Sequence, residues 1–102
     1  MANKISTNAA ACFIAGKTFN QSNTCVNDNA MYLWGNKIIW KNEQNHICFC
    51  LCGWDTHTTC ERLRACGLPI YHKRGVLCYD NLAIDDCAKY EIVGGNDKIK
   101  RL

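Results

Sequence analysis

Residues 53–59 bring hydroxyl, imidazole and carboxylate side chains together just ahead of a predicted helix. The run reads Gly-Trp-Asp-Thr-His-Thr-Thr, and two arginines follow it closely. A helix N-terminus presents unpaired N–H groups and a partial positive charge, which suit a phosphate or a carboxylate. Nearby hydroxyls, imidazole and guanidinium groups would add donors. The predicted anion-binding or nucleic-acid-binding residues are Thr56, His57, Thr58, Thr59, Arg62, Arg64, Lys73 and Arg74.

The same segment also has an ordinary structural interpretation, which the residues alone favour. Thr58 can cap the helix, Trp54 can pack on the sheet, and Asp55 can cap a turn. Each of these roles is local and requires no ligand. The anion site therefore stands as the first functional hypothesis and not as a conclusion.

Large aromatic side chains beside basic residues form a second candidate surface. Trp40 stands between Lys37 and Lys41, and Trp54 lies in the loop before the helix. Aromatic and basic side chains that alternate on a sheet can stack bases and contact phosphates. The net charge of only +3 favours core packing over nucleic acid for most of these aromatics. Trp40 and Trp54 are the predicted contacts for a protein partner.

The nine cysteines predict a reduced, cytoplasmic protein without a metal ion or cofactor. Their odd number and the absence of a recognisable secretory signal argue against a disulfide framework. Cys48, Cys50 and Cys52 alternate along a predicted strand, so their thiols would share one face. Zinc sites favour cysteine pairs on a turn, whereas these thiols are expected to pack as small hydrophobic groups.

Catalysis is not expected from this sequence. His46, His57 and His72 coexist with many cysteines, so a Cys–His pair is conceivable in the fold. None of these residues stands in a recognised nucleophile motif, and the chain has no Gly-rich phosphate loop. The sequence therefore predicts a binding protein and not an enzyme.

The elements that would position these groups are strands and at least one helix. Strands are predicted at 30–34, 37–41 and 46–52, with a turn at Gly35 and a polar connection over 42–45. The continuous apolar run of the third places it centrally in a sheet. A second hairpin is expected to join 69–73 to 76–79 through a turn at Gly75.

A helix over 59–66 is the best-marked element. Thr58 and Glu61 fit a capping box, while Gly67 and Pro69 end the helix. A narrow stripe of residues three positions apart would be buried on this helix, and Arg62 and Arg64 would point outward. The stripe consists of Cys60, Leu63 and Cys66.

Three segments leave alternatives open. Residues 9–15 fit a helix or a strand, and 17–29 read as loop with a short strand near 24–26 as the alternative. Residues 83–90 fit a second helix, whereas 90–93 could equally be a strand. The expected class is α+β: a small, mostly antiparallel sheet of four to six strands with one or two short helices. We expect a single domain over 1–102 with loose termini at 1–8 and 95–102.

Several segments together resemble a family of small domains of unknown function from phages and some bacteria. The resemblance covers roughly residues 24–82, and its most specific part is the Gly53–Leu63 core, which follows a Gly-Trp-x-Thr-x-Thr-Thr-x-x-Arg-Leu pattern. Weaker similarity lies at 34–39, at 72–76 and at Tyr79. The resemblance implies a phage-like origin and a compact α+β fold, and it implies no activity.

Composition and motifs predict a small non-catalytic binding protein, and the resemblance implies that it is a phage-type accessory protein. Its first expected partner is anionic, either a nucleic acid or a nucleotide-like phosphate. The alternatives are a protein-binding inhibitor of a host or defence system and a minor structural protein of the virion. No membrane association is expected, because the apolar stretch at 9–16 is too short to cross a bilayer.

Overall fold

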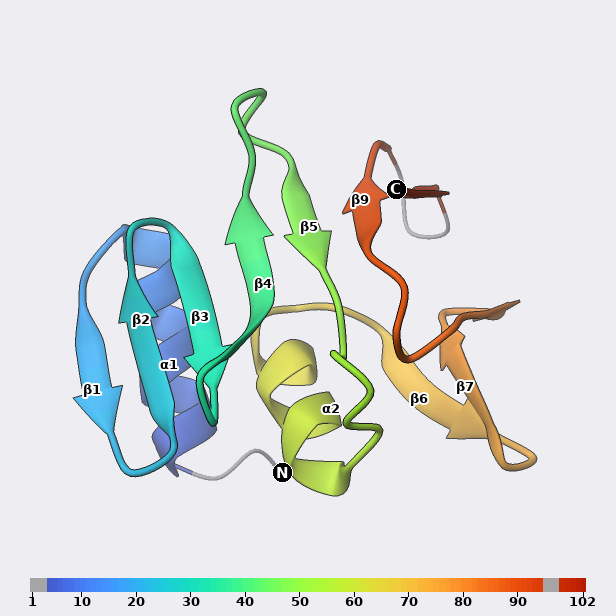
Figure 1. Ribbon diagram of the computed structural model, residues 1–102, viewed down its shortest axis with the longest axis horizontal. Coiled ribbons are helices and arrows are strands. Elements are labelled where there is room, and N and C mark those ends of the chain that lie inside the picture. The colour runs from blue at the N-terminus through green and yellow to red at the C-terminus, as the bar shows by residue number, and fades with distance from the viewer. Residues whose placement is uncertain (1–3, 95–97) are drawn as a thin grey trace.

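Ten strands and two helices make up the part of the chain that this computed structural model describes, residues 4–94 and 98–102. Seven strands form an antiparallel sheet in the order β1-β2-β3-β4-β5-β9-β10, and three form a second sheet in the order β6-β7-β8 (Figure 1). The strands are β1 (Phe19–Gln21), β2 (Thr24–Asn27), β3 (Ala30–Leu33), β4 (Asn36–Lys41), β5 (Ile47–Phe49), β6 (Ile70–Lys73), β7 (Val76–Tyr79), β8 (Leu82–Ala83), β9 (Tyr90–Ile92) and β10 (Ile99–Arg101).

The expected α+β class with four to six strands is therefore wrong, because the chain is mostly β. The first source of the error is the polar stretch 17–29, which forms the β1–β2 hairpin instead of a loop. Its strand residues are largely exposed in β1, so no apolar run marks them. The second source is the segment after β8, where β9 and β10 extend the large sheet and the second helix expected near 83–90 does not form.

Two-residue turns connect the early strands. Asp28 and Asn29 have φ angles of 48° and 63°, and Trp34 and Gly35 have φ angles of 51° and 80°. Paired left-handed residues of this kind match the right-handed twist of the strands that they join. The turn predicted at Gly35 is confirmed, and Arg74 and Gly75 repeat the pattern between β6 and β7, with φ angles of 55° and 80°.

The helix α1 (Lys4–Ala15) forms the layer behind β1–β3 (Figure 1). Its alanines suit a helix, and Ala9, Ala10 and Phe13 are buried against the sheet. The open choice for residues 9–15 is thereby settled in favour of a helix. Residues 4–8 and 99–101, expected to be loose, lie in α1 and β10, while residues 1–3 and 95–97 lie outside the described part.

The second helix, α2 (His57–Ala65), packs against α1 and also contacts β4 and β6.

The strand β5 lies between β4 and β9 in the large sheet, so its predicted central position is confirmed, although it spans only Ile47–Phe49. Phe49 is fully buried between the rings of Tyr79 and Tyr90, at centroid distances of 5.4 Å each. This stack joins the large sheet to the small one.

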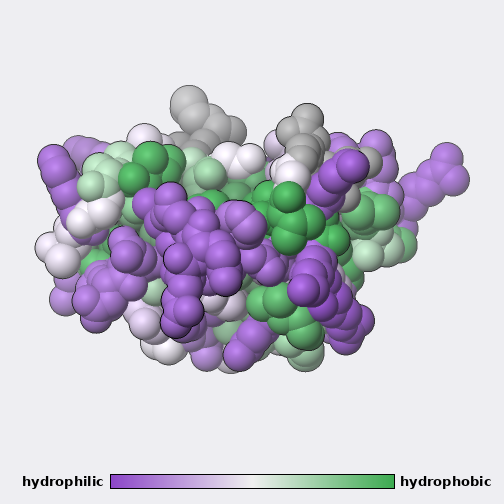
Figure 2. Space-filling model, turned by 90° about the horizontal axis from the view of Figure 1, so that it is seen from above, coloured by the Kyte–Doolittle hydropathy of each residue, from purple (hydrophilic) through white to green (hydrophobic). Residues whose placement is uncertain are grey.

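A polar hairpin connection follows β4, as predicted for residues 42–45. The side-chain oxygen of Asn42 accepts from the backbone N–H groups of Gln44 and His46, and its amide donates to Glu91 on β9. Figure 2, seen from the end of the molecule that carries this connection, shows hydrophilic residues gathered at its centre. That end of the domain is a solvated surface without a large apolar patch at its middle.

Candidate functional site

The start of α2 is capped by Thr56 and not by Thr58. Thr56 has extended backbone angles, and its Oγ1 accepts from the N–H of Thr59 at 3.2 Å. The two threonine hydroxyls are also hydrogen-bonded to each other at 2.9 Å. The predicted capping box of Thr58 with Glu61 is therefore wrong, because the helix begins at His57, two residues earlier than expected.

Removal of this cap tests the assignment. We expect Thr56→Ala to lower the free energy of unfolding by about 1 kcal/mol, because it leaves the Thr59 N–H without its acceptor. Thr58→Ala is the matched control, and it should change stability by less than about 0.5 kcal/mol. Urea denaturation followed by circular dichroism measures both. Equal losses in the two variants would contradict the placement of the cap.

Arg62, a predicted anion contact, lies in the interior and is only 2% exposed. Its Nε donates to Thr24 Oγ1 on β2 at 3.0 Å, and its Nη1 donates to Ser6 Oγ on α1. Nη2 lies 3.4 Å from Asn23 Oδ1. The expectation that Arg62 points outward is wrong, because its donors hold α2 to α1 and β2.

Glu61, in the second turn of α2, completes this buried polar network. Its Oε1 accepts from Ser6 Oγ at 2.9 Å and lies 3.6 Å from Arg62 Nη1, while Oε2 lies 3.2 Å from His57 Nε2. Burial lowers the pKa of Arg62, and the charge of Glu61 opposes that shift. The positive charge of Arg62 is thus offset inside the protein and is not presented to a ligand.

The other predicted cations are spread over the surface. Arg64 donates from Nη1 to the carbonyl of Ile70 at 2.9 Å and lies over the ring of Tyr71. Lys73 donates to Asn81 Oδ1 at 2.6 Å, and Arg74 lies exposed in the turn after β6. None of these contacts joins Arg64, Lys73 or Arg74 to the cap of α2. Lys73 and Arg74 stay predicted contacts for an anion, in the β6–β7 hairpin whose His72 contacts Asp55.

Asp55, His72 and Cys60 meet beside the same loop. His72 Nε2, on β6, lies 2.8 Å and 3.0 Å from the two carboxylate oxygens of Asp55. Cys60 Sγ, on α2, donates to Asp55 Oδ1 at 3.8 Å. Burial, with a smaller contribution from the Asp55 charge, raises the pKa of Cys60 to about 11. The turn-capping role expected for Asp55 is replaced by an ion pair with a strand.

Trp54, a predicted partner contact, is 50% exposed and lies against Trp34, which is 49% exposed. Their ring centroids are 5.8 Å apart and their planes are tilted by 54°. Trp54 therefore does not pack on the sheet as the structural interpretation expected. Trp34 belongs to the aromatic residues near the basic ones but is not among the predicted partner contacts, although its place before Gly35 in a two-residue turn is a signal for exposure.

A groove of about 570 Å³ lies beside Trp34 on the β1–β3 part of the sheet. Its lining residues are uncharged, and apolar atoms contribute more of the exposed lining than polar atoms do. The lining residues are Asn20, Ser22, Asn23, Thr24, Cys25, Asn27, Tyr32, Trp34 and Gly35. Uncharged amides and hydroxyls with aromatic rings at one end can bind a neutral polar chain.

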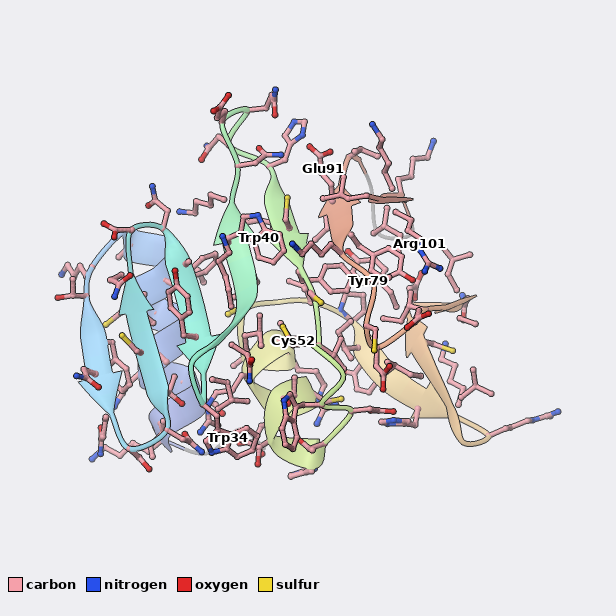
Figure 3. All side chains as sticks on the ribbon, in the orientation of Figure 1. Trp34, Trp40, Cys52, Tyr79, Glu91 and Arg101 are labelled. Atoms are coloured by element: carbon pink, nitrogen blue, oxygen red, sulfur yellow. The ribbon has the colours of Figure 1, made fainter. Side chains whose placement is uncertain are left out.

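Trp40, the other predicted partner contact, is only partly exposed. Lys37 Nζ lies 5.0 Å from the centroid of its ring, whereas Lys41 reaches to the ring of Phe13 and the carbonyl of Ile14. The two lysines therefore do not flank Trp40 on one surface. Figure 3 shows Trp40 near the C-terminal end of β4, and Trp34 at the opposite end of the β3–β4 hairpin, beside α2.

All nine cysteines are free thiols. Cys48 and Cys50 are buried, but Cys52 has a φ angle of 57° and has left the strand, so the three do not form the single row predicted. Cys50 Sγ donates to the carbonyl of Cys87 and Cys52 Sγ to that of Lys37. Burial is the main reason that the pKa of Cys52 rises to about 11. These contacts are those of packed, protonated thiols.

The fold and these surfaces define a small, mostly β domain with two helices and a groove of uncharged residues beside a tryptophan pair. The chain belongs to the phage family described as Kyanoviridae Gp96 protein, whose family model matches residues 2–84. No curated protein and no solved structure gives a significant match. Neither helix of the described part has the length and apolar character needed to span a bilayer.

Proposed function

We propose that this phage protein is a non-catalytic accessory protein that binds an extended segment of a partner protein, in the groove beside Trp34 and Trp54. The observation that carries the proposal is the exposed tryptophan pair. Tryptophan is among the residues most enriched at the energetic centres of protein interfaces. Two half-exposed tryptophans in mutual contact expose apolar area that a partner can cover.

The backbone of Trp34 supports this interpretation. Its φ angle of 51° is in the left-handed region, where a bulky side chain is unfavourable and asparagine is well tolerated. The preceding turn uses Asp28 and Asn29 in the equivalent places. Burial does not offset the strain at Trp34, since half of the residue is exposed. Strained residues cluster at sites of function, and contact with a partner would explain this one.

The groove and the edge of the sheet fit a polypeptide better than a phosphate. The amides of Asn20, Asn23 and Asn27 can exchange hydrogen bonds with a peptide backbone, and no lysine or arginine lines the groove. Within the described part of the chain, β1 pairs with β2 alone, so its outer N–H and C=O groups are at a sheet edge. An extended segment can pair with such an edge while its side chains enter the groove.

The anion-binding hypothesis has less support. Arg62 is buried, the acidic residue Asp55 directly precedes the N-cap Thr56, and a carboxylate oxygen of Glu61 lies 3.2 Å from His57 Nε2. Lys73 and Arg74 lie in another hairpin. Nucleic-acid binding is therefore the outcome that the experiment must distinguish from protein binding.

Trp34→Asn gives the sharpest test, because it should separate binding from folding. We expect this variant to be as stable as the natural protein or more stable, since asparagine suits the left-handed position. Loss of a tryptophan at the centre of an interface should weaken partner binding at least 30-fold, about 2 kcal/mol. The measurement compares the proteins retained from host lysate by the natural chain, Trp34→Asn and Trp54→Ala, followed by titration of the purified partner.

Arg74→Ala is the matched control, since it changes an exposed side chain at the same position of another two-residue turn. It should retain the partner fully. Equal retention by Trp34→Asn and Arg74→Ala would overturn the proposal. Binding of labelled nucleic acid that weakens steeply with salt and is lost in Lys73→Ala/Arg74→Ala would favour the anionic partner instead.

A further inference from the structure

Three side chains from three separate elements bring potential metal ligands to one point. Asp55 comes from the loop before α2, Cys60 from α2 and His72 from β6. The imidazole nitrogen, the thiol sulfur and a carboxylate oxygen all lie within 4.8 Å of one another. Residues distant in sequence that converge in this way supply nitrogen, sulfur and oxygen donors to a single position.

We propose that Asp55, Cys60 and His72 bind a divalent transition-metal ion of the zinc class. At zinc bond lengths, the edges of a tetrahedral site measure about 3.3–3.6 Å. The observed separations are 2.8 Å from His72 Nε2 to Asp55 Oδ1, and 3.8 Å from Cys60 Sγ to Asp55 Oδ1. These two edges lie within about 0.6 Å of the tetrahedral values. The third edge, between the Cys60 thiol and the His72 imidazole, is below 4.8 Å, so a modest contraction would form a tetrahedral ligand set.

The type and exposure of the ligands favour zinc over a hard cation. Thiolate and imidazole ligands suit zinc and cobalt, whereas magnesium and calcium require mostly oxygen ligands. The residue Cys60 is 2% exposed, while the side chains of His72 and Asp55 are 41% and 30% exposed. The site is thus closed by protein on the sulfur side and open to solvent on the other, where water can complete four ligands. Binding would release the thiol proton to solvent.

The order of the groups argues against a nucleophilic role for the same cluster. In a Cys–His–Asp catalytic arrangement, the imidazole lies between the thiol and the carboxylate. Here the carboxylate of Asp55 contacts both the thiol and the imidazole. This arrangement fits a shared ion better than a proton transfer from sulfur to nitrogen.

Metal binding would fix the loop that carries Trp54, because Asp55 is the next residue. It would tie this loop to α2 and to the small sheet at once. The proposal does not depend on a protein partner, and its test measures the ion directly.

Cobalt titration tests the site in the full-length protein, purified without added metal and kept reduced by a phosphine. We expect one equivalent of Co²⁺ to produce a thiolate-to-cobalt charge-transfer band, which one equivalent of Zn²⁺ then removes. Cys60→Ser should abolish the band. His72→Gln should weaken cobalt binding at least about 100-fold. Loss of a residue that only orients a ligand already weakens metal binding about 10–100-fold, and loss of a direct ligand should weaken it more.

Two controls are matched to the site. His46→Gln removes the other histidine that pairs with a carboxylate at 2.8 Å, and Cys87→Ser removes the exposed thiol beside Asp85 and Asp86. Both should bind cobalt as the natural protein does. The proposal is overturned if no band forms, if Cys60→Ser keeps it, or if His72→Gln binds as tightly as His46→Gln. Should Cys60→Ser fail to fold, the exposed His72 still decides the question.

Discussion

Replacement of Arg62 by methionine is expected to lower the free energy of unfolding by about 3–5 kcal/mol. The guanidinium is buried, and it donates to Thr24 and Ser6 and lies 3.6 Å from a carboxylate oxygen of Glu61. Methionine retains much of the volume but none of the donors. The Glu61 carboxylate would then remain largely buried without the charge of Arg62, and removal of one partner of a buried pair is strongly destabilising.

Urea denaturation of Arg62→Met against Arg64→Met measures this effect. Arg64 lies two residues further along α2, is partly exposed, and makes one hydrogen bond to a carbonyl. Its loss should cost no more than about 1.5 kcal/mol. Glu61→Gln combined with Arg62→Met should recover part of the loss, since it removes the buried negative charge that Arg62 offsets. If Arg62→Met and Arg64→Met lost the same free energy of unfolding, the stabilising role of the buried network would be contradicted.

Phe49→Ala is expected to lower the free energy of unfolding by a similar amount, about 3–5 kcal/mol. The ring is fully buried and stacks between Tyr79 at 15° and Tyr90 at 23°. Its removal would leave a cavity where the two sheets meet and would break both aromatic contacts. The damage would therefore reach β7 and β9 as well as β5.

Phe19→Ala serves as the control for Phe49→Ala. Phe19 lies on the edge strand β1 and is only partly buried. Its loss should cost clearly less, about 1–2 kcal/mol. Thermal denaturation and near-ultraviolet circular dichroism, which reports tyrosine packing, compare the two. If both variants lost equal stability, the stack would not be the main junction between the sheets.

The parts of the fold that were predicted correctly carry strong local signals. Gly35 and Gly75 mark two-residue turns between β-branched and aromatic runs, so the hairpins around them follow from the sequence. The strand β1 has no such signal, because Asn20 and Gln21 are exposed and equally suit a loop. Its pairing depends on β2 and on the helix behind it.

The candidate site was harder to predict for a physical reason. Thr56 and Thr58 both precede helical residues and can both cap, so local sequence does not choose between them. From the sequence alone, Arg62 is expected at the surface, because its buried partner Ser6 lies 56 positions away along the chain. The cluster of Asp55, Cys60 and His72 likewise spans three elements, and only the packing of β6 against α2 brings it together.

The order of the strands has a consequence for how the chain reaches its native state. The strands β1–β5 neighbour one another in space in the same order as along the chain, so each joins its predecessor through a short loop with little loss of chain entropy. The pairing of β5 with β9 instead spans some 40 positions, from Phe49 to Tyr90. Nucleation is thus favoured in the N-terminal meander, while the β5–β9 junction closes a long loop and depends on residues synthesised well after the meander.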